Sequence, residues 1–503
     1  MTHHLFIEHL HFSYPGSVTP VFDNLSVQFQ RGWSGIVGAN GSGKSTLLQL
    51  IASLLKPVSG TVRFAEGTHY CEQRTDRVPG AFLRLMASEE SEAYRLRGEL
   101  DIGSDWPERW ESLSHGERKR AQIAGALFCE PPVLLLDEPT NHLDEASKAL
   151  LQYALNRYRG IGLLVSHDRE MLDTLCGHTL FLGDGQPEMR HGSYSAAKIE
   201  REKEAGHARR LHEAKSREIK KLKRQVQAQR QKADRSDARV SKRHVDPKDI
   251  DTKKKIELAV FTGKDATDGR ILERYKSRLA RAEAGQGSIG RDFETGIVIP
   301  AERFRRLFPV TLEPTVLALD ATRQVRVPRL VLAEGERVGI TGVNGSGKST
   351  LLRHLLASRE WPDGSVLFIP QEITAEDSTA LMKRVAELDG ERKGELMGLV
   401  RRLGSDPGAL LQSVLPSPGE TRKLMLALGM ASRPGLIIMD EPTNHMDLGA
   451  IEALETALTS YEGALMLVSH DRAFLSHTVQ REWHFETDPS GETRIIEGEM
   501  LAR

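Results

Sequence analysis

Two segments of the chain fit the phosphate-binding pattern GxxxxGK[ST]: residues 38–46 read GANGSGKST, and residues 342–350 read GVNGSGKST. The glycines let successive backbone N–H groups curl around phosphate oxygens, and the helix that follows presents its positive end. Lys44 and Lys348 would neutralise β and γ phosphates, and the serine after each would supply a hydroxyl to magnesium. The candidate nucleotide-binding residues are Gly38, Asn40, Gly41, Gly43, Lys44, Ser45 and Thr46 in the first loop, and Gly342, Asn344, Gly345, Gly347, Lys348, Ser349 and Thr350 in the second.

Two adjacent carboxylates follow each loop at the end of an apolar run, and a histidine ends the next run. The aspartate of each pair would hold magnesium or its waters. The glutamate beside it is placed to orient or deprotonate an attacking water, and the histidine to contact the γ phosphate. The candidate metal ligands are therefore Ser45, Asp137, Ser349 and Asp440, and the candidate catalytic residues are Glu138, Glu441, His167 and His470.

These motifs belong to an internal repeat. LLLDEPTNHLD at residues 134–144 returns as IIMDEPTNHMD at residues 437–447, and the offset between equivalent residues is 303 or 304 throughout. One isolated loop of this kind is also compatible with a chance match or an inactive site. Two loops, each with its carboxylate pair and histidine at the same spacing, argue against that interpretation.

The elements that must position these residues are short strands and helices in alternation. Apolar runs such as VLLLD and LIIMD, bounded by Gly, Pro or Asp, indicate buried parallel strands, and each phosphate loop opens a helical pattern. A chain of 503 residues is also too long for one hydrophobic core. We therefore expect an α/β protein with two tandem P-loop NTPase domains, the first repeat at residues 1–192 and the second repeat at residues 287–503.

Residues 193–286 have a different, polar character. From Ser195 to about Ala238 there is no proline and one glycine, which predicts a single helix of about 66 Å. Asp246 before Pro247 indicates the start of a return helix that ends near Gly285. Together they predict an antiparallel helical hairpin with its tip near residues 240–246. Its expected apolar contact positions are Leu211, Ile219, Leu222 and Val226, with Ile271, Tyr275 and Leu279 on the return helix.

The hairpin is strongly basic, although the whole chain has a net charge of only −1. Residues 201–284 contain 26 Lys and Arg against 14 Asp and Glu. A solvated coiled coil that spaces the two repeats is one interpretation. Binding to RNA or another nucleic acid is the other, and scarce aromatic residues favour the backbone of folded RNA over single strands. The candidate phosphate contacts are Lys220, Lys221, Lys223, Arg224, Arg230, Lys242, Arg243, Lys253, Lys254 and Lys255.

A further repeated pattern, S-x-x-E, begins at Ser114 and at Ser417, each 23 residues before the aspartate of a carboxylate pair. Such a pattern alone also describes an ordinary helix-capping box. In this context, LSHGE, DEPTNHLD and SHD, with Gln73 and Gln371 between loop and signature, resemble the ATP-binding cassette superfamily. DEPTNH occurring twice in one chain resembles its ABC-F group, and the likeness covers nearly the whole chain, including the charged linker.

The resemblance implies a head-to-tail pairing of the two repeats within one monomer, with two ATP molecules at the interface. The site built on Lys44, Gln73, Asp137, Glu138 and His167 would be completed by Ser417 and Gly419. The other site, built on Lys348, Gln371, Asp440, Glu441 and His470, would be completed by Ser114 and Gly116. Gln73 and Gln371 join the candidate magnesium ligands. ABC-F members typically act on ribosomes, which implies contact of the hairpin with ribosomal RNA and with tRNA.

The chain departs from the family pattern in ways that predict unequal sites. His115 and Pro418 replace the first glycine of the usual signature, and proline has no N–H to donate. Tyr14 stands where an adenine-stacking aromatic is expected, although a packed strand residue is the alternative. The matching stretch of the second repeat, residues 309–342, contains no aromatic residue.

Three classes of function fit these observations. The first is a ribosome-associated ATPase, either a translation factor or an antibiotic-resistance protein that protects the ribosome. The others are the ATPase subunit of a membrane exporter and a DNA-associated repair ATPase. No apolar stretch approaches the roughly 20 residues that cross a bilayer, and the start lacks a basic leader. Three dispersed cysteines suit a reducing compartment, so we expect a cytoplasmic protein without a membrane partner.

Overall fold

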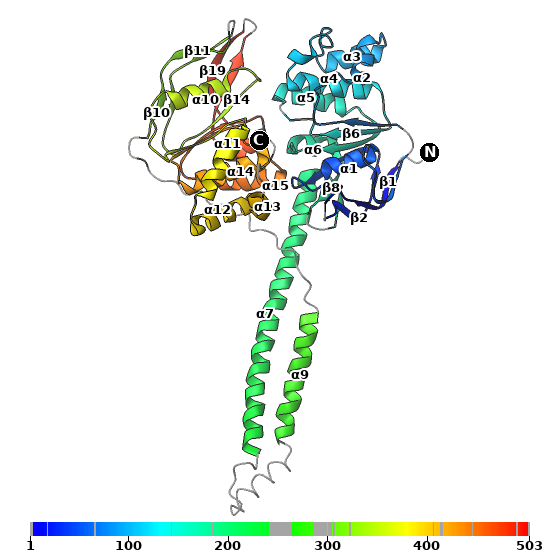
Figure 1. Ribbon diagram of the computed structural model, residues 1–503, viewed down its shortest axis with the longest axis vertical. Helices are drawn as coiled ribbons and strands as arrows, with labels where there is room; N and C mark the ends of the chain where they lie inside the picture. Colours follow the sequence, from blue (N-terminus) through cyan, green and yellow to red (C-terminus); the bar gives the residue numbers. More distant parts are fainter. Residues whose placement is uncertain are drawn as a thin grey trace, which may run out of the picture. The chain divides into compact units, whose positions relative to one another are not determined.

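The structure of this protein is a computed structural model (Figure 1). It describes residues 4–17, 19–64, 67–141, 143–183, 186–240, 264–284, 299, 304, 307–320, 323–405, 407–412, 416–444, 446–488 and 491–500. The chain divides into two compact units. Unit 1 consists of Met1–Ala197 and Phe293–Arg503, and unit 2 of Lys198–Asp292. Within the described ranges, no helix is both long and apolar enough to cross a membrane.

The first repeat contains a six-stranded sheet in the order β5-β6-β7-β3-β8-β9, in which only β9 runs antiparallel to its neighbour. A separate antiparallel sheet has the order β2-β1-β4. The strands are β1 (His4–Phe12), β2 (Phe22–Gln30), β3 (Gly32–Gly38), β4 (Ser59–Arg63), β5 (Thr68–Cys71), β6 (Val133–Asp137), β7 (Ile161–Val165), β8 (Cys176–Leu182) and β9 (Glu188–His191). The helices are α1 (Lys44–Ile51), α2 (Gly80–Ala87), α3 (Ser91–Glu99), α4 (His115–Phe128), α5 (Glu145–Leu155) and α6 (Arg169–Leu175).

The second repeat has an eight-stranded sheet in the order β11-β12-β19-β18-β14-β17-β16-β15, whose strands β18, β14, β17, β16 and β15 are parallel. The strands are β10 (Val310–Leu312), β11 (Thr315–Ala318), β12 (Gln324–Val327), β13 (Leu330–Leu332), β14 (Arg337–Gly342), β15 (Val366–Ile369), β16 (Leu436–Asp440), β17 (Ala464–Val468), β18 (Arg481–Thr487) and β19 (Glu492–Glu499). The helices are α10 (Lys348–Ala357), α11 (Ala375–Ala386), α12 (Gly390–Arg402), α13 (Pro407–Gln412), α14 (Pro418–Ala431), α15 (Leu448–Thr459) and α16 (Arg472–Thr478).

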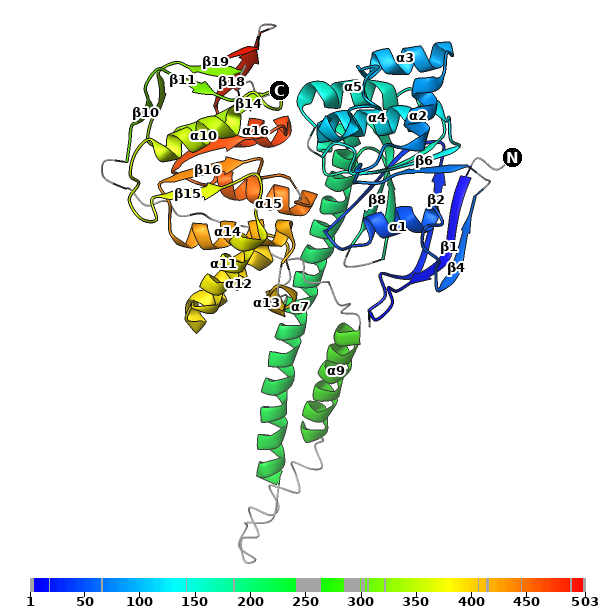
Figure 2. The same ribbon diagram turned by 45° about the horizontal axis from the view of Figure 1, so that its top comes forward.

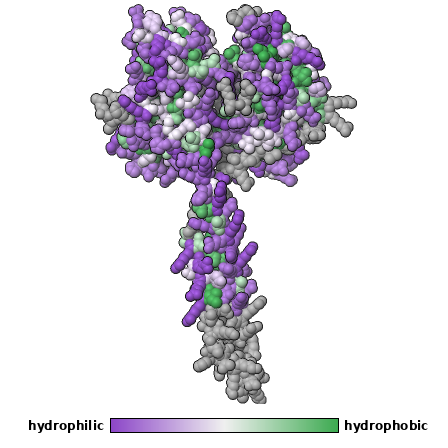
Figure 3. Space-filling view, turned by 180° about the vertical axis from the view of Figure 1, so that it is seen from behind, coloured by the Kyte–Doolittle hydropathy of each residue, from purple (hydrophilic) through white to green (hydrophobic). Residues whose placement is uncertain are grey.

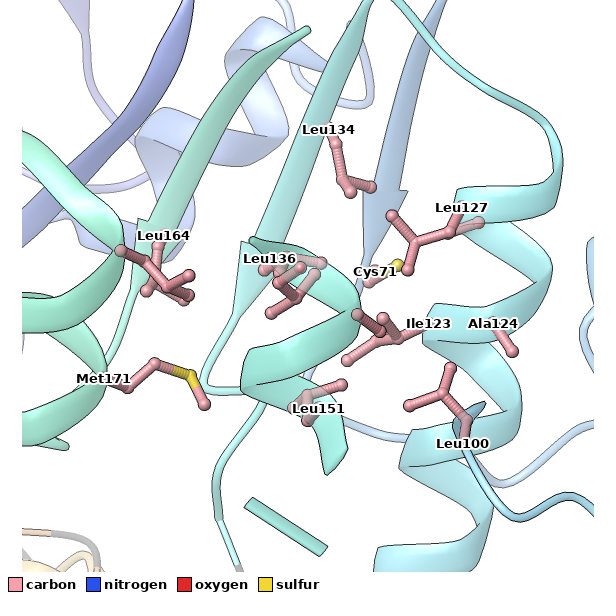
Figure 4. Close-up of a cluster of buried hydrophobic side chains, with 14 of the residues drawn as sticks. Cys71, Leu100, Ile123, Ala124, Leu127, Leu134, Leu136, Leu151, Leu164 and Met171 are labelled. Atoms are coloured by element: carbon pink, nitrogen blue, oxygen red, sulfur yellow. The ribbon is translucent and has the colours of Figure 1, made fainter. Parts of the chain in front are cut away.

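The predicted apolar runs are the central parallel strands, so the expected α/β fold is confirmed. Every residue of β6, β7, β16 and β17 is buried, because helices cover both faces of these strands. Figure 4 shows part of the core of the first repeat, where Leu134 and Leu136 of β6 face Ile123 and Leu127 of α4. Since the carboxyl ends of parallel strands meet at one edge, this packing brings the phosphate loop, the carboxylate pair and the histidine together.

Unit 2 contains most of α7 (Tyr194–Val240) and all of α9 (Lys264–Ala284), which lie side by side (Figures 1 and 2). Nζ of Lys223 lies 3.0 Å from Oε1 of Glu283, at the end of α9. Because α9 runs from there along the C-terminal part of α7, the helices are antiparallel, as the sequence predicts. The expected tip and the start of the return helix at Asp246 lie outside the described residues.

The apolar contact between these helices is shorter than the sequence indicates. Ile219 and Leu222 are only 6% and 3% exposed, and Val226 is half-buried. Leu211 is 52% exposed, so its assignment to the contact stripe is wrong. The reason is position, since Leu211 precedes Lys223 by about three helical turns and α9 ends beside Lys223.

Candidate functional site

The phosphate loops are built by glycines in a conformation that other residues rarely adopt. Gly43 caps the start of α1 with a φ of 91°, and Gly347 caps the start of α10 with a φ of 99°. This left-handed turn leaves the first N–H groups of each helix facing the loop. Nζ of Lys44 donates to the carbonyl oxygens of Gly38 at 2.8 Å and Ala39 at 3.1 Å. Lys348 makes the same pair of contacts with Gly342 and Val343 in the second loop.

The carboxylates proposed as magnesium ligands stand at the ends of β6 and β16. Oδ1 of Asp137 and Oδ1 of Asp440 are buried and make no hydrogen bond within the described residues. A buried, unpaired carboxylate oxygen is costly unless a cation or donor occupies the space in front of it. Oxygen donors of this kind, with a serine hydroxyl on the adjoining helix, are the ligands that Mg²⁺ prefers. The residues present therefore fit a magnesium–nucleotide complex.

The glutamates that follow these aspartates adopt unusual backbone conformations. Glu138 has a φ of 47° and Glu441 a φ of 49°, which are left-handed values for residues other than glycine. The backbone N–H of each glutamate donates to the neighbouring strand, to the oxygen of Val165 at 2.9 Å or of Val468 at 2.8 Å. Strain of this kind persists where surrounding structure imposes it, and it is concentrated at functional sites.

Burial sets the protonation of the glutamates and histidines. It raises the pKa of Glu138 to about 8 and that of Glu441 to about 7, and the adjacent aspartates act in the same direction. Burial lowers the pKa of His167 and His470 to about 3, aided by the charges of Lys44 and Lys348. Each pair is close, with Nε2 of the histidine 3.0 Å from Oε1 of the glutamate in the first repeat and 3.4 Å in the second. Despite this closeness, Oε1 of Glu138 and Oε1 of Glu441 make no hydrogen bond within the described residues.

One cavity of about 830 Å³ brings residues of both repeats together. Lys348, Gln371 and Asp440 line it from the second repeat, and Ser114 and Gly116 line it from the first. This is the combination that the resemblance implies for the second nucleotide site. Further lining residues from the sequence prediction are Asn344, Gly345, Gly347, Ser349, Thr350, Glu441, His470 and, from the first repeat, His167.

The first site also receives residues from the second repeat. The backbone N–H of Asn40 donates to Oδ2 of Asp447 at 3.2 Å, while Oδ1 of Asp447 caps α15. Asp144 has the same double role, capping α5 and accepting from the N–H of Asn344 at 3.5 Å. Sequence reasoning did not single out these aspartates, although they end the repeated segments LLLDEPTNHLD and IIMDEPTNHMD. One carboxylate thus joins a helix start to the opposite phosphate loop.

The signature segments are helix starts as well as cavity walls. Ser114 caps α4 and Ser417 caps α14, and both form complete capping boxes with Glu117 and Glu420. Pro418 occupies the first position of α14, where an N–H has no partner within a helix and proline is favoured. The missing N–H therefore costs the helix nothing, and the N–H of Gly419 follows it.

Basic side chains that sequence reasoning missed form hydrogen bonds to the backbone at Gln73 and Gln371. Nζ of Lys119 on α4 donates to the oxygen of Glu72 at 2.7 Å and to that of Gln73 at 3.2 Å. Arg422 on α14 donates to the oxygen of Gln371 at 2.6 Å. Lys119 and Arg422 are buried and are equivalent in the repeat, a positional match that the constant offset could have revealed.

The two expected adenine-binding regions differ. The Tyr14 hydroxyl lies 2.9 Å from Oγ1 of Thr46, and its ring stands edge-on to Phe12 with centroids 5.0 Å apart. Tyr14 is therefore anchored to α1 and remains partly exposed. In the second repeat, Leu319 and Arg323 line the cavity next to the phosphate loop.

The candidate phosphate contacts of the hairpin fall partly within the described residues. The side chains of Lys220, Lys221, Lys223, Arg224 and Arg230 are exposed on α7. Lys220, Lys221 and Arg224 line a groove of about 420 Å³ on this helix. Figure 3 shows the described part of unit 2 as mainly hydrophilic with scattered apolar side chains. Lys242, Arg243, Lys253, Lys254 and Lys255 lie outside the described residues.

Two P-loop domains in one chain, with the second phosphate loop and the signature segment of the first domain lining one cavity, are typical of a tandem ATP-binding cassette protein. The ABC transporter family model matches residues 22–141 and 326–399. The ribosome protection protein VmlR of Bacillus subtilis (strain 168) is 30% identical over 486 residues, which cover 93% of this chain and 84% of that protein. The chain therefore belongs to the ABC-F family of ATP-binding cassette ATPases.

Other comparisons agree with this assignment. The erythromycin resistance ATP-binding protein MsrA of Staphylococcus epidermidis is 27% identical over 457 residues, covering 89% of this chain and 91% of that protein. Among solved structures, an archaeal ribosome recycling factor in complex with a ribosomal stalk protein superposes with a TM-score of 0.62 at 18% identity. It covers 98% of this chain and 90% of that one, and at this identity the likeness establishes the fold.

Proposed function

We propose that this ABC-F protein is a ribosome-associated ATPase that binds two ATP molecules between its repeats and uses their hydrolysis to time its release from the ribosome. In this proposal it acts in the cytoplasm as a monomer, either as a translation factor or as an antibiotic-resistance protein that protects the ribosome. The observation that carries the proposal is the shared cavity, in which Ser114 of one repeat and Lys348 of the other face the same space.

In the proposed mechanism, Lys44 and Lys348 leave their own loop carbonyls to bind β and γ phosphate oxygens. Asp137 with Ser45 and Gln73 would hold Mg²⁺ in the first site, and Asp440 with Ser349 and Gln371 would hold it in the second. When bound, Mg²⁺ supplies positive charge that stabilises the triphosphate and favours the ionised form of the carboxyls beside it. In the ionised form, Glu138 and Glu441 can accept a proton from the attacking water. His167 and His470, neutral because burial lowers their pKa, can donate an N–H to the γ phosphate.

Closure of the repeats would depend on the γ phosphate. Ser114 with Gly116 and Ser417 with Gly419 stand at the starts of α4 and α14, and in this proposal they would present a hydroxyl and the positive helix end to the opposite site. Loss of the γ phosphate removes the group that these donors bind, so hydrolysis favours reopening. The stacking of adenine on Tyr14 is a further part of the proposal, and the second site would use Leu319 and Arg323 in its place.

Binding to ribosomal RNA, and to tRNA where the hairpin reaches it, is proposed for the basic residues of the hairpin. Five of them are exposed on α7, where they can neutralise phosphates without desolvating buried charge. The relatives support this part, because one is called a ribosome protection protein and another an erythromycin resistance protein. Attachment of this kind is strongly salt-dependent and largely independent of base sequence.

The Glu138→Gln/Glu441→Gln variant tests whether ATP hydrolysis times release from the ribosome. Both substitutions keep the shape of the side chain but remove the base, so ATP binding should persist while reopening stalls. We expect the variant to sediment with ribosomes in ATP and to slow protein synthesis in a cell-free system. Glu170→Gln, an exposed position on α6, is the control. A double variant that fails to sediment with ribosomes at modest salt would exclude the ribosomal assignment, and sedimentation with membranes or DNA would favour the other two classes.

Charge reversal on α7 tests the proposed contact between the hairpin and the ribosome separately. The triple variant Lys220→Glu/Lys221→Glu/Arg224→Glu should release the trapped double variant from ribosomes. The slope of the logarithm of the binding constant against the logarithm of salt concentration should fall by the amount expected for about three lost phosphate contacts. Reversing three exposed basic residues of unit 1, Lys383, Arg384 and Arg433, is the matched control. Equal loss in both would show that the hairpin is not the binding surface. Expression in a drug-sensitive host across ribosome-targeting antibiotics would then separate protection from housekeeping.

A further inference from the structure

The two nucleotide sites differ at the strand that borders the candidate magnesium aspartate. In the first repeat Tyr70 of β5 pairs in register with Leu135 of β6. In the second repeat Phe368 of β15 pairs with Ile438 of β16. Leu135 and Ile438 are equivalent in the repeat, so Tyr70 and Phe368 are equivalent too. The sites thus differ by one hydroxyl at this position.

The hydroxyl of Tyr70 is bonded to the aspartate. It donates to Oδ2 of Asp137 at 3.0 Å, and the side chain of Gln49 on α1 interacts with the same hydroxyl. The ring of Tyr70 packs against the core of the first repeat, which limits its movement. Oδ1 of Asp137 makes no hydrogen bond in the part of the chain that the structure describes. The carboxylate is therefore held through one oxygen while the other stays available.

The second site holds its aspartate differently. Asp440 interacts with the hydroxyl of Ser349, which is itself a candidate magnesium ligand, and with the charge of Arg353, the counterpart of Gln49. Phe368 has no hydroxyl to offer. Oδ1 of Asp440, like Oδ1 of Asp137, makes no hydrogen bond within the described residues, so each aspartate has an oxygen available. The first site differs by the Tyr70 hydroxyl, which holds Asp137 and is not itself a candidate magnesium ligand.

We propose that Tyr70 is a positioning residue that orients Asp137 toward Mg²⁺, so that the first site takes up magnesium–nucleotide at a lower Mg²⁺ concentration than the second. A partner that holds a ligating carboxylate typically changes metal affinity about 10- to 100-fold. The inference rests on the proposed magnesium role of Asp137 and Asp440, and it is independent of ribosome binding.

Each site can be measured alone in the full-length chain. Lys348→Ala confines tight nucleotide binding to the first site, and Lys44→Ala confines it to the second. Binding of a fluorescent ATP analogue is followed across a Mg²⁺ titration and in EDTA. We expect the first site to reach half-saturation at about tenfold less Mg²⁺ than the second. Tyr70→Phe should raise that concentration about tenfold and leave nucleotide affinity in EDTA unchanged.

Tyr158→Phe is the matched control, because the Tyr158 hydroxyl also makes a partly buried bond, 2.6 Å from the oxygen of Pro131, away from the carboxylate. It should leave the Mg²⁺ requirement unchanged. Gln49→Leu, which retains the hydroxyl of Tyr70, should raise the requirement by a smaller factor, and it provides the test if Tyr70→Phe lowers the melting temperature below the assay range.

The outcomes separate the two claims. If neither single-site protein depends on Mg²⁺, the magnesium assignment fails. If Mg²⁺ dependence is present but Tyr70→Phe leaves it unchanged, or weakens binding equally in EDTA, the positioning role of Tyr70 is overturned and the magnesium assignment stands.

Discussion

Two ion pairs join the repeats at equivalent arginines, and their different burial predicts different strengths. Nη2 of Arg169 lies 2.7 Å from Oε2 of Glu455, with the side chains 14% and 11% exposed. Arg472 pairs with Glu145, with side chains 56% and 52% exposed. Removing one partner of a buried pair typically costs about 3–5 kcal/mol, because the other charge stays desolvated. An exposed pair contributes about 0–1 kcal/mol.

We expect Arg169→Met to reduce the free energy of unfolding by about 2 kcal/mol, below the usual range because His477 still contacts Glu455. A double-mutant cycle with Glu455→Gln should give a coupling energy of about 2 kcal/mol that changes little with salt. The same cycle for Arg472 and Glu145 should give less than about 1 kcal/mol and vanish at high salt.

Urea unfolding followed by tryptophan fluorescence, at low and at high sodium chloride, provides the measurement. The nucleotide-free protein is used, because the two pairs are present without ligand. Equal coupling energies for the two pairs, or a strong salt dependence of the Arg169 cycle, would refute the reasoning from burial.

The glutamates give two further predictions. The pKa of Glu138 is about 8 and that of Glu441 about 7 in the folded protein, against 4.5 for the unfolded chain. The folded state therefore favours the neutral carboxyls. Their contribution to the free energy of unfolding is fully present below pH 4.5 and is lost as the pH rises to 7–8. Glu138→Gln should therefore stabilise the nucleotide-free protein at pH 8 by on the order of 3 kcal/mol, and have no such effect at pH 4, in thermal unfolding across pH. Separately, Glu138→Gln and Glu441→Gln should reduce steady-state ATPase activity to different extents, because the sites differ at Tyr70 and Phe368; equal losses would contradict unequal sites.

The motif residues could be located from the sequence because their chemistry depends on local spacing. A phosphate loop is a turn followed by a helix, so Gly43 and Lys44 carry its signal within a few residues, and the repeat doubles that signal. Ser114 illustrates the limit of this reasoning. Its pattern predicts a capping box as well as a signature segment. The structure shows the capping box and places the capped helix start at the cavity, and the signature role stays a prediction.

Contacts between distant residues could not be found in this way. Leu211 has the spacing of a stripe residue, yet the length of the partner helix leaves it exposed. The bond between Asn40 and Asp447 joins positions 407 residues apart, and nothing in either segment alone indicates it. Tyr70 looks like any strand aromatic until the register of β5 and β6 places its hydroxyl at Asp137.

The sequence by itself therefore determined the α/β class, the duplication and the antiparallel pairing of α7 with α9, and it located the candidate phosphate-loop, carboxylate and histidine residues. Only the tertiary structure decided which residues of one repeat face the sites of the other, how the two sites differ, and which ionisable groups are buried. The physical reason is that spacing along the chain governs local backbone geometry, whereas desolvation and pairing between remote residues arise only when the packed strands and helices bring them together.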